Sequence, residues 1–251
     1  MIDEKGEDIA LIMFSGIQFY TGQFFDIKAI TAAGHRRGCV VGFDLAHAVG
    51  NVELKLHDWG VDWAAWCSYK YLNGGPGAIG GVFVHKKHEN NTELKRLNGW
   101  WGIDLKRRMQ MDNDDLPLLA GAKGYAVSCT PVLTIMPLLA SLEIFQSVGM
   151  TKLIEKQKLL TGYLECLILE NFDQTEVKIL TPRTMQDRGC QLSISFSIDL
   201  DTVFGEIERH GVVCDMRRSH VIRVAPAPLY NSFKDVFKFV KVLKKVIKEK
   251  A

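Results

Sequence analysis

The chain has 251 residues, of which 47% are hydrophobic and 24% are charged, and its formal net charge is +2 at pH 7. This balance is typical of a soluble globular protein that is long enough for two domains. A net charge close to zero argues against nucleic acid as the main partner, because phosphate binding depends on clustered Lys and Arg. The apolar runs are too short to span a bilayer and no signal peptide opens the chain, so we expect no membrane partner.

Six cysteines are spread along the chain without C-x-x-C spacing, at positions 39, 67, 129, 166, 190 and 214. Several of them lie inside apolar runs, where a thiol behaves as a small hydrophobic group. Free thiols are typical of a reducing compartment. The sequence therefore predicts a cytoplasmic protein.

The first part of the chain alternates apolar runs with polar segments. Residues 9–14 form a continuous apolar run, which is typical of a strand buried on both faces. A helix is expected over residues 27–35, and further strands over 39–43 and 63–67 with a connection over 54–60 between them. The order strand, helix, strand, helix, strand predicts a parallel sheet with helical crossovers.

Two side chains with useful chemistry follow these predicted strands. Asp44 comes after the run 39–43, and Lys70 comes after the run 63–67, just before a loop with five glycines between residues 74 and 81. Ligands in open α/β sheets bind outside the carboxyl ends of the strands, so Asp44 and Lys70 are expected to face the same crevice. A pyridoxal phosphate (PLP) enzyme needs such a pair, because the lysine forms the Schiff base and the carboxylate keeps the pyridine nitrogen protonated. The simpler interpretation of Lys70 alone is a solvated loop lysine.

The second part of the chain predicts an apolar helix over residues 133–148, an amphipathic helix over 152–169 and a smaller α/β unit from 177 onward. Residues 190–198 alternate apolar and polar side chains, which indicates a strand with one face in water. A helix over 202–210 and strands over 212–214 and 221–225 follow.

The last helix is predicted to begin at Ser232, with Asp235 three residues later as an acid in the first turn. A buried stripe at three-to-four spacing is expected along this helix. Its predicted members are Phe233, Val236, Phe237, Val240, Leu243 and Ile247.

Eight short segments along nearly the whole chain resemble the kynureninase family. In the first half they are YTGQ at 20–23, GFDLAHAVGN at 42–51, HDWGVD at 57–62 and WCSYKYLN at 66–73. In the second half they are RGCQL at 188–192, GVVCD at 211–215, IRVAP at 222–226 and PLYN at 228–231. These segments are far more specific than one lysine after a strand.

The resemblance implies an α/β fold of the aspartate aminotransferase type. Its PLP-binding large domain has a mostly parallel sheet, here incomplete and covering residues 1–134, and residues 135–251 supply connecting helices and a smaller C-terminal α/β domain. The implied enzyme is a PLP-dependent hydrolase of carbon–carbon bonds in ketonic substrates, active in tryptophan catabolism and NAD biosynthesis. It cleaves L-kynurenine or 3-hydroxykynurenine into L-alanine and anthranilate or 3-hydroxyanthranilate, works as a homodimer and uses no metal.

The resemblance also assigns roles to single residues. Lys70 would be the catalytic Schiff-base lysine, Arg223 would bind the substrate carboxylate through its planar fork, and Trp100 would reach the site from the other subunit. The implied contacts with the cofactor come from Ser15, Asp44, His47, Tyr69, Lys70, Trp100 and Cys129. Among these, Asp44 pairs with the pyridine nitrogen, and Ser15 and Tyr69 contact the phosphate.

Each assignment has a simpler alternative. Asp44 could cap a helix, His47 could satisfy a buried hydrogen bond, and Tyr69 and Trp100 could be core or interface aromatics. Arg223 could pair with Asp215 for structural reasons alone. The resemblance favours the functional roles because all of these residues fall at matching positions of one pattern.

The sequence departs from the family in three places. Family members are longer at the amino end, where the turn that cradles the phosphate and the aromatic side chain that stacks on the ring belong, so we expect an amino-terminally truncated chain with weak PLP binding. Cys129 stands where vertebrate members have asparagine near the substrate ring, which puts the preference for the 3-hydroxy substrate in doubt. Pro76 stiffens the glycine-rich loop.

Two other functions remain open from the sequence. The chain could be a catalytically impaired fragment that acts only through dimerisation with the full-length enzyme. It could instead be a related PLP enzyme, such as a cysteine desulfurase-like lyase or a class V aminotransferase.

Overall fold

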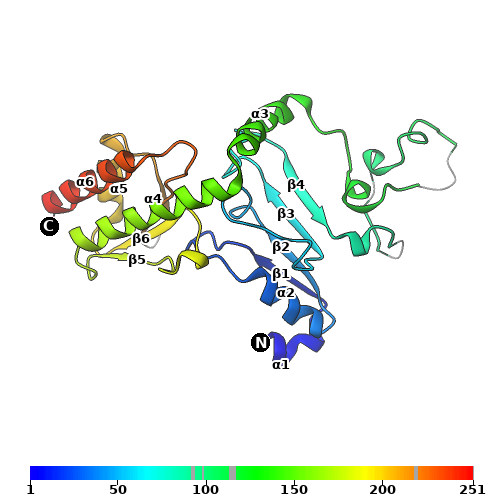
Figure 1. Cartoon of the computed structure of the whole chain (residues 1–251), viewed down its shortest axis with the longest axis horizontal. Helices are drawn as coiled ribbons and strands as arrows, with labels where there is room; N and C mark the ends of the chain where they lie inside the picture. The colour runs from blue at the N-terminus through cyan, green and yellow to red at the C-terminus, as the bar shows by residue number, and fades with distance from the viewer. Residues whose placement is uncertain (92–93, 98, 113–116, 218–219, 251) are drawn as a thin grey trace. The chain divides into compact units, whose positions relative to one another are not determined.

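The computed structural model describes every residue except 92–93, 98, 113–116, 218–219 and 251 (Figure 1). The chain folds into two compact units. The first unit comprises Met1–Gly16, Asp26–Val49 and Leu54–Glu143, and the second comprises Ile17–Phe25, Gly50–Glu53 and Ile144–Ala251. The predicted domain boundary at residue 134 stays a prediction.

The first unit is built on a four-stranded sheet in the order β1-β2-β3-β4 (Figure 1). Its strands are β1 (Leu11–Ser15), β2 (Val40–Asp44), β3 (Trp63–Cys67) and β4 (Gly80–Val84). β1, β2 and β3 are parallel, and β4 runs antiparallel to β3. The prediction of an α/β fold with a mostly parallel sheet is therefore confirmed.

Helix α2 (Ile27–Arg36) connects β1 to β2 as predicted. The carboxylate of Asp26 caps it by accepting a hydrogen bond from the amide of Ala29 at 2.9 Å. The second predicted crossover helix was wrong, because turns connect β2 to β3. Gly50 and Gly60 in this connection have φ values of +79° and +73°, a backbone conformation that an α-helix does not contain.

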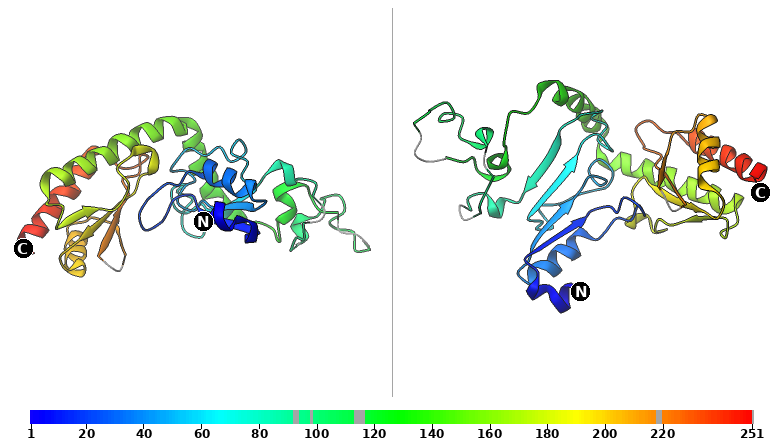
Figure 2. Two further views of the ribbon diagram at one scale, coloured as in Figure 1. Left: turned by 90° about the horizontal axis from the view of Figure 1, so that it is seen from below. Right: turned by 180° about the vertical axis from the view of Figure 1, so that it is seen from behind.

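The sheet of the first unit is covered on one face by α2. Gly34 of α2 lies so close to the sheet that an added Cβ would be 2.5 Å from Val41 Cγ2 and 2.9 Å from Ile12 Cδ1. The prediction that β1 is buried on both faces was wrong: Met13 is 62% exposed and Leu11 is 50% exposed. β1 is an edge strand, and in the described part of the chain no helix covers these side chains (Figure 2).

Two tryptophans lie flat across neighbouring strands of this sheet. Trp63 is the cross-strand partner of Gly42, and a Cβ at Gly42 would lie 2.0 Å from the Trp63 indole. Trp66 has the same relation to Gly81, with a distance of 2.4 Å. Each glycine thus makes room for an indole ring on its neighbour.

Asp62, just before β3, joins three parts of the first unit. Its carboxylate, 5% exposed, accepts hydrogen bonds from His35 Nε2 at 2.8 Å, His88 Nε2 at 2.7 Å and the Val41 amide at 2.7 Å, and Lys87 Nζ lies at 2.5 Å. Burial alone would raise the pKa of Asp62, but the hydrogen bonds from these four groups together hold it well below its usual value. The ionised carboxylate therefore ties α2 and the turn at 86–88 to the sheet.

Replacement of Asp62 by asparagine is expected to lower the free energy of unfolding by about 3 kcal/mol, because it removes one partner from buried ion pairs. A carboxyl whose pKa is lower in the folded state stabilises the protein above its unfolded pKa and stops doing so as the pH falls. Urea unfolding should therefore show the full difference in free energy of unfolding between the unaltered protein and Asp62→Asn at neutral pH. Below pH 3.8 this difference should be smaller. The exposed Asp58→Asn serves as control, and an Asp62→Asn protein as stable as this control at neutral pH would contradict the account.

Short helices and a long segment after β4 complete the first unit. The segment after β4 projects from the sheet (Figure 1) and contains only single 3-10 turns in its described residues. The short helices are α1 (Ile2–Lys5), η1 (Gly6–Asp8), η2 (Lys86–His88), η3 (Trp100–Gly102) and η4 (Gly121–Tyr125).

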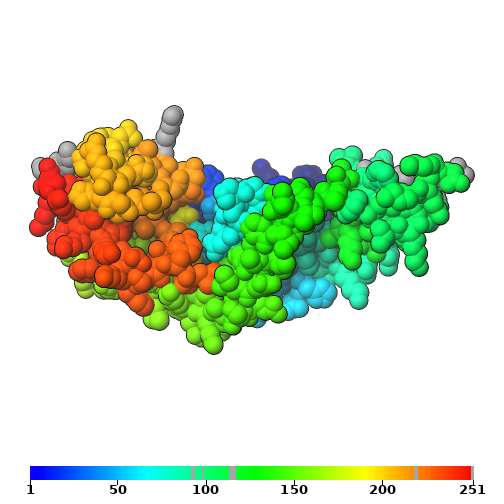
Figure 3. Space-filling view, turned by 90° about the horizontal axis from the view of Figure 1, so that it is seen from above, coloured from blue at the N-terminus to red at the C-terminus, as the bar shows by residue number. Residues whose placement is uncertain are grey.

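Two long helices follow, α3 (Val132–Val148) and α4 (Met150–Asn171), separated by Gly149 with φ +83°. α3 is apolar yet lies on the surface, with Leu133 86% exposed and Met136 54% exposed (Figure 3). No single helix among the described residues is long and apolar enough to cross a bilayer; α3 and α4 meet that test only as a pair, which is bent at Gly149.

The second unit contains an antiparallel sheet in the order β5-β6-β8-β7. Its strands are β5 (Val177–Ile179), β6 (Leu192–Phe196), β7 (Asp215–Arg217) and β8 (Val221–Val224), and the turn η5 (Met185–Asp187) precedes β6. The helices α4, α5 (Leu200–Arg209) and α6 (Phe233–Lys250) share one hydrophobic core with the sheet. The predicted strand at 212–214 was wrong, because the paired residues are those of β7.

The predicted wet face of β6 was also wrong. Ser193 is fully buried, because the segment Ile17–Phe25 of the second unit lies against it. The Ser193 hydroxyl donates to the carbonyl of Tyr20 at 2.5 Å, and the Thr181 hydroxyl donates to the carbonyl of Thr21 at 2.6 Å. Ser193 therefore binds another segment of the chain instead of facing water. The sequence showed that this residue is polar, but not which group it binds.

The predicted start of α6 is confirmed, and the predicted stripe is only partly correct. The Ser232 amide and hydroxyl donate to Asp235 Oδ2 at 2.9 and 2.8 Å, and the Asp235 amide lies 3.3 Å from the Ser232 oxygen, which is a reciprocal cap. Phe233 and Phe237 are about half exposed, at 46% and 50%. The buried side of the helix instead consists of Val236, Phe239, Val240, Leu243, Val246 and Ile247.

Gly189→Ala is expected to lower the free energy of unfolding by about 1–3 kcal/mol, because overpacking a buried contact has that cost. The added Cβ would lie 2.4 Å from the side chain of Asn51, whose Oδ1 accepts a hydrogen bond from the Cys190 amide at 2.8 Å. Urea unfolding measures the change.

The matched control is Gly205→Ala in α5, where a Cβ meets nothing within 4 Å. This control should stabilise the protein by up to about 1 kcal/mol through higher helix propensity. Equal stability of the two variants would show that Asn51 does not restrict position 189.

Candidate functional site

The carboxyl ends of β1, β2 and β3 lie along one edge of the first unit's sheet, because the three strands are parallel. Ser15 at the end of β1 is the direct cross-strand partner of Asp44 at the end of β2, and Asp44 pairs with Ala65 of β3. Lys70 follows three residues after the end of β3. The structure therefore brings Ser15, Asp44 and the turn with Lys70 to the same edge, as the sequence predicted.

Asp44 is exposed, and one of its oxygens is engaged locally. Its Oδ1 accepts a hydrogen bond from the Ala46 amide at 2.8 Å, so the carboxylate does stabilise the turn that follows β2. In the described part of the chain, Oδ2 has no hydrogen-bond partner. His47 in this turn is half-buried and lies edge-on to the ring of Tyr71, with 6.1 Å between the ring centroids.

A network of backbone hydrogen bonds holds Lys70 in its turn. The Asn73 amide donates to the Lys70 carbonyl at 2.9 Å, and the Gly74 amide donates to the Ser68 carbonyl at 2.9 Å. Ser68 is buried, and its hydroxyl donates to the carbonyl of Ile79 across the loop. The ammonium group of Lys70 lies 5.7 Å from the ring centroid of Tyr69. The loop is thus fixed on both sides of the lysine.

The sequence interpretation missed two residues of this turn, Ser68 and Asn73. Asn73 adopts the left-handed backbone conformation at φ +54°, which asparagine tolerates better than most residues. An asparagine directly before two glycines was the signal that could have identified this turn. Nothing in the sequence marked the buried bond of Ser68, because it depends on the return of the chain at Ile79.

Tyr69 is 53% exposed and lies close to two acidic groups. A hydrogen bond with Cys67 raises the pKa of Tyr69, and the charges of Cys67 and Asp44 raise it further. The raised pKa of Tyr69 favours the protonated phenol, which is a hydrogen-bond donor at this edge of the sheet.

The other predicted residues lie elsewhere in the fold. Trp100 lies in η3, is 50% exposed and donates from Nε1 to the Arg108 carbonyl at 2.6 Å. Cys129 is exposed in the loop between η4 and α3, with its thiol 3.6 Å from the Thr130 carbonyl. Within the described chain, neither residue contacts Asp44 or Lys70.

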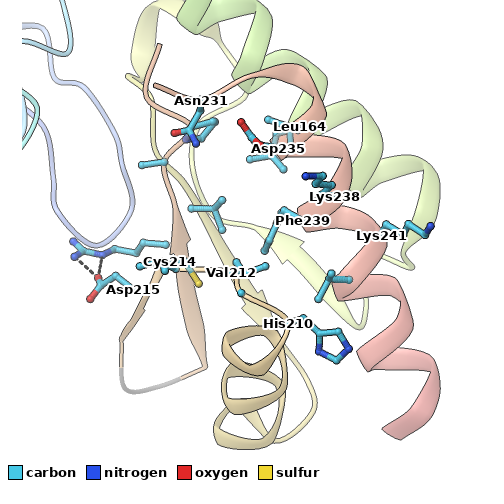
Figure 4. Close-up of a pocket in the computed structure, with 18 of the residues that line it drawn as sticks. Leu164, His210, Val212, Cys214, Asp215, Asn231, Asp235, Lys238, Phe239 and Lys241 are labelled. Atoms are coloured by element: carbon cyan, nitrogen blue, oxygen red, sulfur yellow. Dashed lines mark hydrogen bonds and ion pairs between the residues drawn. The ribbon is translucent and has the colours of Figure 1, made fainter. Parts of the chain in front are cut away.

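Arg223 belongs to β8 of the second unit and is only 11% exposed. Its Nε donates to the carboxylate of Asp215, with which its Nη2 also forms an ion pair, and its Nη1 donates to the Phe19 carbonyl at 2.8 Å. The pairing of Arg223 with Asp215, which the sequence left open as an alternative, is therefore present in the structure. The pair borders a groove between α6 and residues 210–215 (Figure 4).

Comparison with known proteins gives a consistent result along the whole chain. Residues 153–243 match the kynureninase C-terminal domain family. Kynureninase of Mus musculus is 55% identical over 98% of this chain, that of Homo sapiens 53% over 98%, and that of Nematostella vectensis 51% over 98%. The chain is similar to kynureninases along nearly its whole length. It spans about half the length of these curated relatives, 54% for the mouse and human proteins and 55% for the sea anemone protein.

Solved structures of PLP-dependent proteins share the fold of this chain. A cysteine desulfurase from Thermococcus onnurineus has a TM-score of 0.79 at 16% identity and covers 99% of this chain and 62% of its own. A structure of C-DES with glycine covalently linked to its PLP cofactor has a TM-score of 0.83 at 18% identity, with 97% and 62% covered. At these identities the likeness establishes the fold alone.

The residues at the strand ends fit a PLP group. Lys70 supplies an amine on a fixed turn, Asp44 supplies a carboxylate with one oxygen left for a protonated ring nitrogen, and Ser15 and Tyr69 supply hydroxyl donors for a phosphate. All four belong to the first unit. These four residues therefore fit the Schiff-base, ring-nitrogen and part of the phosphate contacts of PLP.

Proposed function

We propose that this chain functions in a kynureninase, a PLP-dependent hydrolase that cleaves L-kynurenine or 3-hydroxykynurenine into L-alanine and anthranilate or 3-hydroxyanthranilate. The observation that carries the proposal is the placement of Asp44 and Lys70 at one edge of a parallel sheet, in a chain 48–55% identical to kynureninases. In this proposal the chain supplies the lysine, the carboxylate and the C-terminal domain of the active enzyme.

PLP, when bound, withdraws electrons from the carbon atoms next to the substrate amine. In the proposed site the amine of Lys70 would hold the group and would accept and return the substrate proton. The Asp44 carboxylate would keep a proton on the ring nitrogen. Ser15 and Tyr69 would bind the phosphate, and His47 would lie next to the ring.

Two further assignments belong to this proposal. Arg223 binds the carboxylate of the substrate, and Trp100 contributes to the site of the other subunit in a homodimer. Trp100 is half exposed and makes no contact with Asp44 or Lys70 among the described residues, which is compatible with a role in a second subunit. The proposed compartment is the cytoplasm, since all six cysteines are free.

A second candidate function rests on the uncovered face of the first sheet. Leu11, Met13, Val40 and Val82 are each at least 42% exposed and share one face by their register. Parallel sheets are normally covered on both faces. The alternative is therefore a chain that acts by association with the full-length enzyme, without turnover of its own. A cysteine desulfurase-like activity is less well supported, because those proteins share only 16–18% identity with this chain.

The decisive experiment is PLP binding followed by borohydride reduction and mass spectrometry. The proposal expects one PLP-modified lysine, Lys70, and kynurenine turnover in the complete protein. Lys70→Ala should abolish both the modification and the turnover, because no other amine replaces the attachment point.

The matched control is Lys55→Ala, since Lys55 is also in the first unit but lies before β3. Labelling and turnover should both persist in this variant. A Lys70→Ala protein that still turns over kynurenine would refute the assignment. Labelling without turnover in the isolated chain would favour the second candidate.

A further inference from the structure

The segment Ile17–Phe25 lies across one face of the second sheet and presents a backbone carbonyl to Arg223. The Phe19 carbonyl accepts hydrogen bonds from Arg223 Nη1 at 2.8 Å and from Gln191 Nε2 at 2.9 Å. Neighbouring carbonyls are bound by Ser193 and Thr181. Arg223 is therefore part of a hydrogen-bonded surface whose other members are fixed by β6 and the residues before it.

Asp215 approaches Arg223 from the neighbouring strand. The two residues are direct cross-strand partners in β7 and β8. Asp215 Oδ2 accepts a hydrogen bond from Nε and forms an ion pair with Nη2 (Figure 4). Arg217, two residues further along the same face of β7, places its Nε 3.1 Å from the same oxygen. One carboxylate therefore faces two guanidinium groups, which leaves the cluster with a net positive charge.

A count of donors shows what remains available on Arg223. A guanidinium has five N–H groups. Asp215 accepts the N–H on Nε and forms an ion pair with Nη2, and Phe19 accepts one N–H on Nη1. Within the described residues at least one N–H on each terminal nitrogen therefore has no hydrogen-bond acceptor in the protein. Two such donors are what a carboxylate needs for a two-oxygen contact with arginine.

We propose that Asp215 is a positioning residue for carboxylate recognition: with the Phe19 carbonyl it fixes the plane of the Arg223 guanidinium and leaves two donors for the carboxylate of an α-amino acid. The inference rests on the proposed function, because it takes Arg223 as the group that binds the substrate carboxylate. Asp215 does not touch the substrate. Its effect is to hold the fork in one orientation before binding, which lowers the ordering cost of recognition.

The test compares two ligands that differ only in the carboxylate, L-alanine and L-alanine methyl ester, by calorimetric titration of the PLP-loaded protein. Asp215→Ala should weaken L-alanine binding by about 10- to 100-fold, the loss typical of a misplaced contact group. Binding of the methyl ester should not change. Asp215→Asn retains an oxygen acceptor for Arg223 and should recover part of the affinity for L-alanine.

The matched control is Asp173→Ala, which removes an exposed aspartate before β5, at the opposite edge of the same sheet. Both ligands should bind this variant as they bind the unaltered protein. If Asp215→Ala weakens the binding of both ligands equally, Asp215 has a general structural role and the inference is wrong. Unchanged binding of L-alanine would also overturn it. An unaltered protein that binds neither ligand would refute the proposed function itself.

Discussion

The parallel register of β1, β2 and β3 is the constraint on which the candidate site depends. A parallel sheet brings the carboxyl ends of its strands to one edge, so the residues that follow each strand become neighbours without being close in sequence. Ser15, Asp44 and Lys70 are separated by 29 and 26 positions along the chain. Their placement at one edge of the sheet is a consequence of pairing between strands, and no local motif could produce it.

The two units divide the work of the proposed enzyme. The first unit holds the amine and the carboxylate that a PLP group needs. In the same unit, Asp62 ties helix α2 and the turn at 86–88 to the sheet. The second unit holds Arg223 on an antiparallel sheet, with Asp215 and the Phe19 carbonyl as its partners. Under the proposed function, two different kinds of sheet would supply the chemistry at the strand ends and the recognition of a carboxylate.

Sequence reasoning located β1, β2, β3, β6 and β8, the helix α2, the cap of α6 and the strand-end residues, because these depend on local pattern or on a specific motif. It failed where a contact between distant segments decided the outcome. Ser193 looked like a wet-face residue and is buried under Ile17–Phe25, and the exposed side of β1 looked like a buried strand. The predicted stripe of α6 was only partly correct because the nine apolar residues of this helix allow more than one buried face, and only packing against α4 and α5 selects one.

The paired glycines and tryptophans of the first sheet link positions that are far apart in sequence. The Trp63 indole occupies the volume that a Cβ at Gly42 would need, two residues before Asp44. A larger side chain at position 42 is therefore compatible with this strand pairing only if position 63 becomes smaller. In evolutionary terms the two positions therefore change together. A protein that keeps Trp63 must keep Gly42, whereas a protein with a smaller residue at position 63 can accept a larger side chain at position 42, next to the candidate site.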